Sequence, residues 1–184
     1  MLVVTACYDT LLEQMFQEQG KKYVVVTHIS YADDEGSVGK VVVQYSDRPD
    51  EAEICLSDEL SIDLDEWWVF YKIQGTFDLC LKGLGGKEEV DSIIISESDY
   101  VAFLSRLSDQ HRTIPTLFMR PFQQRMFLFA GYYMSDWNFR TVAHILREDE
   151  KIRKIKGYAV RKGASGFEQH HWDSENVQVI DMEV

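Results

Sequence analysis

Two short runs of strand-forming residues flank a helical pattern within the first 27 residues, and this arrangement limits the fold more than any other feature. The runs Leu2-Val3-Val4-Thr5 and Tyr23-Val24-Val25-Val26-Thr27 are rich in β-branched residues, which is typical of strands buried on both faces. A strand, a helix and a strand in so short a segment predict the βαβ unit of a parallel sheet.

The helix between these strands is predicted from its ends and its apolar stripe. Thr10 and Glu13 fit a capping box at the start, and Gly20 is expected to end the helix. The side chains expected to face the sheet are Leu11, Leu12, Met15 and Phe16.

The remaining chain continues this alternation, with a turn at 47–50. Strands are expected at 40–45, 67–73, 92–95, 126–130, 157–160 and 176–184. Helices are expected after Ser98, across 113–124, after Ser135 or Asp136, and across 167–172. The sequence therefore predicts one α/β domain over residues 1–184, built on a mostly parallel sheet with helices on both faces.

Composition excludes several classes of function. The 184 residues carry 31 acidic and 19 basic side chains, a formal charge of −12, which disfavours nucleic-acid binding. No run of 18 or more apolar residues occurs, so no membrane span is expected. The first ten residues lack the features of a signal peptide, which favours a cytoplasmic protein. Cys7, Cys55 and Cys80 form no CxxC pair, and no metal site is predicted, even at His170-His171.

Distinctive residues follow three of the predicted strands. They are Thr5-Ala6-Cys7-Tyr8-Asp9-Thr10-Leu11-Leu12-Glu13, Lys72-Ile73-Gln74-Gly75-Thr76-Phe77-Asp78, and Gly131-Tyr132-Tyr133-Met134-Ser135-Asp136-Trp137-Asn138-Phe139-Arg140. Ligands of open parallel sheets bind beyond the carboxyl ends of the strands, so these segments are the candidate site.

In this order, the three segments resemble motifs of the bacterial sirtuin-like domains that cleave NAD in antiphage defence. In that family they commonly read T-T-N-Y-D-x-L-L-E, K-L-H-G-x-x-D and G-Y-S-x-x-D-W-N-x-R. The resemblance implies a Rossmann-like fold and NAD as the cofactor. It also implies that the residues contacting NAD are Thr5, Tyr8, Asp9, Gly75, Gly131, Tyr133 and Asp136.

This sequence departs from the family at the positions that carry the chemistry. The family asparagine, which helps to position the ribose and the attacking water, corresponds to Cys7, and the family histidine, the general base or ribose contact, corresponds to Gln74. The motif serine corresponds to Tyr133. The first glycine-rich βα unit, which cradles the phosphates in the family, is expected to be missing, because Met1 already begins the strand of the first motif. The chain is thus expected to be the C-terminal portion of the family domain.

Structural readings compete with the functional ones at several of these residues. Cys7 is expected to be a buried thiol, with a nucleophile using His28 as base as the alternative. Asp136 is expected to cap a helix, and Asp9 to support the turn after the first strand.

Glutamine cannot accept a proton near neutral pH, so the sequence predicts a catalytically impaired pseudoenzyme that acts in binding or assembly. Its expected partner is another protein or a second copy. The alternative is an NAD hydrolase that needs a complementing segment.

Overall fold

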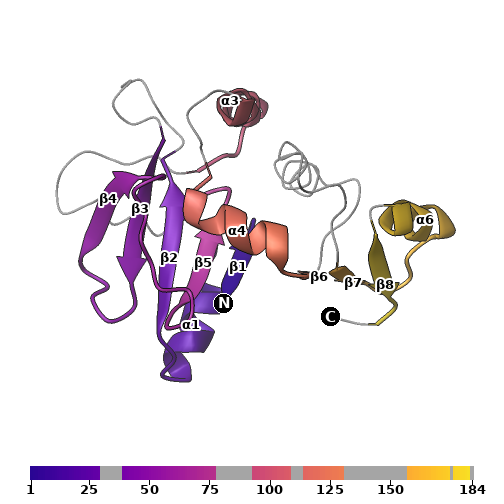
Figure 1. The fold of residues 1–184 in the computed structure, drawn as a ribbon, viewed down its shortest axis with the longest axis horizontal. Helices are drawn as coiled ribbons and strands as arrows, with labels where there is room; N and C mark the ends of the chain where they lie inside the picture. The colour runs from indigo at the N-terminus through magenta and orange to yellow at the C-terminus, as the bar shows by residue number, and fades with distance from the viewer. Residues whose placement is uncertain (30–38, 78–92, 109–113, 131–156, 175, 183–184) are drawn as a thin grey trace. The chain divides into compact units, whose positions relative to one another are not determined.

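The computed structural model describes residues 1–29, 39–77, 93–108, 114–130, 157–174 and 176–182 (Figure 1). The chain divides into two compact units, Met1–Phe118 and Met119–Val184. Each unit contains its own sheet.

The sheet of the first unit is mixed, and its strand order is β1-β5-β2-β3-β4. Its strands are β1 (Leu2–Thr5), β2 (Tyr23–His28), β3 (Lys40–Tyr45), β4 (Ala52–Leu56) and β5 (Trp68–Lys72). β5 pairs in parallel with both β1 and β2, which confirms the predicted βαβ arrangement. β3 is antiparallel to β2 and β4.

Helix α1 (Leu11–Glu18) buries only half of its predicted stripe. Leu12 and Phe16 pack on the core, where the Phe16 ring meets the Phe70 ring edge to face at 4.9 Å. Leu11 and Met15 are exposed. The helix ends at Gly20 as predicted, because Gly20 adopts a left-handed φ of 61° that a side chain would disfavour.

The opposite face of this sheet meets helices α3 (Glu97–Ser108) and α4 (Thr116–Gln124). The His28 ring stacks on Phe103 of α3 at 5.1 Å, and Tyr71 contacts Phe118 of α4 at 5.1 Å. Because alternate residues of a strand face opposite ways, Tyr71 and its neighbour Phe70 lie on different faces. Helices on both faces are therefore confirmed for this sheet.

Two local predictions before α4 were wrong. Residues 93–95 form no strand, since Ile94 is buried and its N–H donates to the Gln74 carbonyl at 3.0 Å. The cap of α3 is Ser96 and not Ser98: Ser96 Oγ accepts the N–H of Asp99 at 3.2 Å, and Asp99 Oδ2 accepts the N–H of Ser96 at 2.8 Å. The hydrogen bonds from Ser96 hold the pKa of Asp99 below its usual value.

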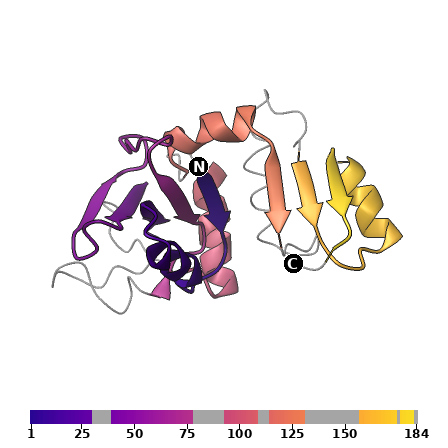
Figure 2. The same ribbon diagram turned by 90° about the horizontal axis from the view of Figure 1, so that it is seen from below.

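The second unit contains a three-stranded parallel sheet, in the order β6-β7-β8 (Figure 2). Its elements are β6 (Phe127–Ala130), β7 (Gly157–Val160), α6 (Gly166–Ser174) and β8 (Val177–Ile180). Trp172 of α6 is fully buried and packs on Phe129 with ring centroids 5.2 Å apart. A Cβ at Gly157 would lie 2.3 Å from the Phe127 carbonyl oxygen, so only glycine permits this pairing of β6 and β7.

Candidate functional site

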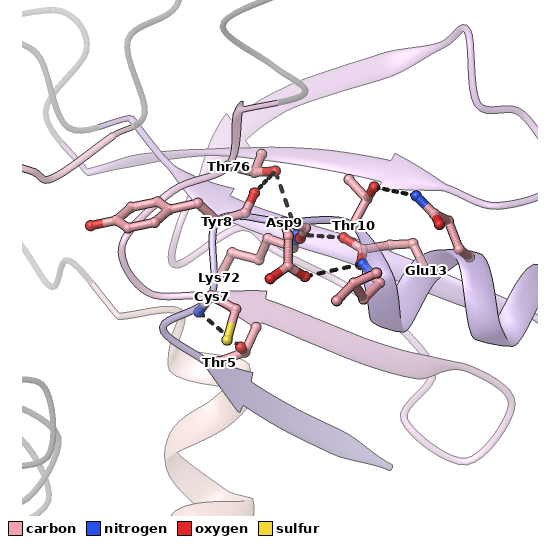
Figure 3. A network of polar contacts seen from close by, with 10 residues as sticks. Thr5, Cys7, Tyr8, Asp9, Thr10, Glu13, Lys72 and Thr76 are labelled. Atoms are coloured by element: carbon pink, nitrogen blue, oxygen red, sulfur yellow. Dashed lines mark hydrogen bonds and ion pairs between the residues drawn. The ribbon is translucent and has the colours of Figure 1, made fainter. Parts of the chain in front are cut away.

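The first two distinctive segments meet because β1 and β5 are parallel neighbours. Thr5 pairs with Lys72 at the last position of both strands, and the Ile73 N–H donates to the Thr5 carbonyl at 3.0 Å. The turns that follow the two strands therefore lie side by side (Figure 3). This edge is where an open parallel sheet binds its ligands.

The turn after β1 is closed by its own side chains. Thr5 is buried, and its Oγ1 accepts the N–H of Cys7 at 3.0 Å. Asp9 Oδ1 accepts the N–H of Leu11 at 3.1 Å, which satisfies one of the free N–H groups at the start of α1. This contact agrees with the supporting role predicted for Asp9.

The turn after β5 is tied to the Tyr8 backbone. The Thr76 hydroxyl and the Phe77 N–H both donate to the Tyr8 carbonyl at 3.3 Å. Gly75 has a φ of 90°, a conformation open to glycine and strained for other residues. Gln74 is buried, with 6% of its surface exposed, and its amide cannot act as a base.

Tyr8 links both turns to a third segment. Its ring lies 5.3 Å from that of Phe77, and its hydroxyl donates to the Ile94 carbonyl at 2.5 Å. Burial, followed by the negative charge of Asp99, raises the pKa of Tyr8 above its usual value. The phenol therefore stays protonated near neutral pH and serves as a hydrogen-bond donor.

A buried ammonium lies beneath the two turns. Lys72 is 1% exposed, and its Nζ lies 2.6 Å from Glu13 Oε1 and 3.4 Å from Thr76 Oγ1. The same nitrogen donates to the Asp9 carbonyl. A lysine ammonium has three donors, so these contacts use its full capacity.

The Lys72–Glu13 pair corrects the predicted capping box. The Thr10 side chain makes no capping bond and instead accepts the Gln14 side-chain amide at 2.9 Å. Glu13 turns toward Lys72, because a buried ammonium needs a carboxylate more than an exposed helix end does. The Lys72–Glu13 ion pair was not predicted from the sequence. A lysine directly after the apolar run Val69-Phe70-Tyr71 nevertheless indicated a buried ammonium that needs a partner.

The expectation of a buried thiol at Cys7 was wrong, since Cys7 is free and exposed. Cys7 lies in the turn after β1, where its N–H donates to Thr5 Oγ1 at 3.0 Å. His28, the suggested base, is 2% exposed and stacked under Phe103.

The structure brings four of the predicted cofactor residues together, and three lie outside the described residues. Thr5, Tyr8, Asp9 and Gly75 belong to the paired turns. The residues outside the described part of the chain are Gly131, Tyr133 and Asp136.

A pocket of about 490 Å³ lies between α1 and the β2–β3 strands, next to the paired turns. Its described lining includes the carboxyl-bearing residues Glu13 and Asp50 and the amides of Gln14, Gln17 and Gln44. The described lining contains neither lysine nor arginine, so this pocket is poorly suited to a phosphate.

The paired turns offer no general base at residue 74, because the Gln74 amide accepts no proton near neutral pH. Cys7 contributes a thiol, and all three donors of the Lys72 ammonium are engaged. Among the described residues, no group of three or more His, Cys, Asp or Glu side chains is placed to hold a metal ion.

The fold and this edge define an α/β protein whose candidate site lies at the carboxyl ends of parallel strands. The sequence matches the SIR2-like domain over residues 1–180, so the chain belongs to that family, whose members generally bind NAD. No curated protein matches the chain. None of the helices in the described ranges is long and apolar enough to cross a membrane.

Proposed function

We propose that this SIR2-like protein is a catalytically impaired pseudoenzyme that acts through binding or assembly in the cytoplasm. The observation that carries the proposal is the pair Cys7 and Gln74, which stand where the family has its asparagine and its histidine. Neither residue has the chemistry of the group that it replaces: glutamine accepts no proton, and a thiol lacks the two-sided hydrogen bonding of an amide. By analogy with the family it resembles, the protein belongs to a bacterial antiphage system.

The contacts of the paired turns support a structural role for the remaining polar groups. Asp9 is engaged at the start of α1, Tyr8 holds the Ile94 carbonyl, and Lys72 is bound to Glu13. Each of these groups makes a contact that holds the turns together.

Calorimetric titration of the full chain with millimolar NAD is expected to show weak binding or none, and a coupled assay no loss of NAD. We expect this result because the described lining of the pocket beside the paired turns carries carboxyl groups and neither lysine nor arginine, and because the Gln74 amide cannot act as a base. The matched control is Gln74→His alone, which is also expected to leave NAD intact, because Cys7 still lacks the two-sided hydrogen bonding of an amide. Measurable turnover by the unmodified chain would contradict the proposal.

The alternative function is NAD hydrolysis with a complementing segment, and the open side of β1 favours it. Met1 and Thr5 direct their carbonyls to β5, so the backbone groups of Leu2 and Val4 point the other way. Among the described strands, β1 pairs with β5 only. A strand followed by a glycine-rich turn, supplied by another segment or chain, would add to this edge in parallel.

This alternative predicts a gain of activity that depends on residue 74. With a strand–turn peptide of Gly-Ala-Gly type added, Gln74→His is expected to raise NAD turnover by about 10²–10⁴-fold over the unmodified chain, the usual contribution of a general base. The control Gln74→Leu carries no base and is expected to give no increase. Absence of turnover in every combination would remove the hydrolase alternative.

A further inference from the structure

The second edge of the large sheet is β4, a strand with an exposed apolar side. In the described part of the chain, β4 pairs with β3 only. Ile54 is 48% exposed and Leu56 is 39% exposed, and the two side chains lie on the same face because they are two positions apart in the strand. Strand edges of this kind are templates for pairing with another chain.

The β3–β4 register shows which backbone groups of β4 make no hydrogen bond with β3. The Ser57 N–H donates to the Gly39 carbonyl at 2.8 Å, and this pair continues the β3–β4 register. Since hydrogen-bonded positions alternate along an antiparallel pair, Glu53 and Cys55 also exchange bonds with β3. Of the intervening residues, Ala52 and Ile54 have both their N–H and C=O groups pointing outward, and Leu56 has its N–H pointing outward. The Leu56 carbonyl already accepts the N–H of Glu59 at 3.0 Å.

The outward groups of one β4 strand can form hydrogen bonds with the same groups of a second β4 strand. We infer that β4 pairs antiparallel with β4 of a second copy of this chain, about a two-fold axis at Ile54. In that register Ile54 exchanges two hydrogen bonds with its own counterpart, and the Leu56 N–H of the second copy donates to the Ala52 carbonyl. The outward N–H and C=O groups of Ile54 then both have partners, as do the Ala52 carbonyl and the Leu56 N–H.

The side chains agree with the same register. Ile54 meets Ile54 of the second copy, and Ala52 lies opposite Leu56, so the exposed apolar side chains cover one another. Glu53 lies opposite Cys55 and not opposite a second Glu53, which avoids a clash of like charges within the strand.

The ends of the strand bring negative charges together. Asp50 and Glu51 precede β4, and Asp58 and Glu59 follow it, on a chain of net charge −12. Antiparallel pairing places the start of one strand beside the end of the other. Salt screens this repulsion, so the dimer is expected to strengthen as ionic strength rises.

The second copy is one form of the assembly partner proposed above, and in that sense this inference rests on the proposed function. The two fail separately, however. A monomer would remove the β4 interface and leave the result of the NAD titration unchanged, and NAD turnover would leave the interface in place.

Sedimentation velocity of the full chain over a range of concentrations tests the interface. The unmodified chain is expected to dimerise, more strongly at about 0.5 M than at about 0.05 M NaCl. Ile54→Pro removes an outward N–H that β3 does not use, so it is expected to spare the fold and to weaken the dimer by about tenfold or more. The control Ile54→Val keeps the backbone donor and is expected to dimerise nearly as well. A monomer at every concentration, or a dimer unaffected by Ile54→Pro, would overturn the inference.

Thiol cross-linking tests the register without relying on the proline variant. Glu53→Cys places a thiol opposite Cys55 of the second copy, at a non-hydrogen-bonded pair whose Cα atoms lie about 4.5 Å apart. Burial, then the carboxylates of Glu53 and Glu59, raises the pKa of Cys55, so oxidation is done at mildly alkaline pH. A covalent dimer is expected for Glu53→Cys and not for Glu51→Cys, which carries the same native thiols. Equal cross-linking of both variants, or of neither, would exclude this register.

Discussion

Replacing Lys72 by methionine is expected to lower the free energy of unfolding of the Met1–Phe118 unit by about 3–5 kcal/mol. The Lys72 ammonium is buried, with its nitrogen 2.6 Å from Glu13 Oε1, and methionine would leave that carboxylate without its charge partner. The Asp9 carbonyl would lose its donor at the same time. Urea unfolding of the full chain, followed by hydrogen exchange of the β1, β2 and β5 amides, measures the loss.

Two further variants distinguish the effect of breaking the Lys72–Glu13 ion pair from the effect of removing any lysine charge. Lys22→Met breaks a pair with Glu66 whose side chains are 58% and 56% exposed, and it is expected to cost at most about 1 kcal/mol. Combining Lys72→Met with Glu13→Leu is expected to recover most of the stability, because no unpaired charge then stays buried. If Lys72→Met behaves like Lys22→Met, the Lys72–Glu13 pair does not stabilise the paired turns.

Replacing Trp172 by alanine is expected to destabilise the Met119–Val184 unit by about 3–5 kcal/mol. Trp172 is fully buried, and its ring packs on Phe129, so its removal leaves a cavity between α6 and the parallel sheet. The expected measurement is faster hydrogen exchange of the β6, β7 and β8 amides, with the first unit unchanged.

The same helix provides the control for this substitution. Phe167 is 81% exposed, and Phe167→Ala is expected to change stability by no more than about 0.5 kcal/mol. Equal effects of the two substitutions would mean that α6 does not use Trp172 to hold the small sheet.

The elements with strong local patterns were predicted correctly. β-branched runs identified β2 and β3, and the Asp47-Arg48-Pro49-Asp50 turn is present after β3. β4 was missed, because the residues Ala52–Leu56 follow no simple alternation of buried and exposed side chains. At an edge, one strand neighbour is absent, so burial no longer produces the pattern that identifies a strand.

The candidate site was predicted in part. The order of the motifs was enough to place Thr5, Tyr8, Asp9 and Gly75 at strand ends, and the structure brings these residues together. The partners of Lys72 were beyond local reasoning, since Glu13 lies 59 positions earlier in the chain (72 − 13). The exposure of Cys7 likewise depends on how the turn leaves the sheet.

The sequence by itself determined the α/β class and the βαβ start, because these depend on residue type and short-range periodicity. Only the tertiary structure decided the use of Glu13 as an ion-pair partner, the place of β4 at the edge of the described sheet, and the division into two units. Those features depend on which strands become neighbours, and strand neighbours are chosen by long-range packing that no local pattern encodes.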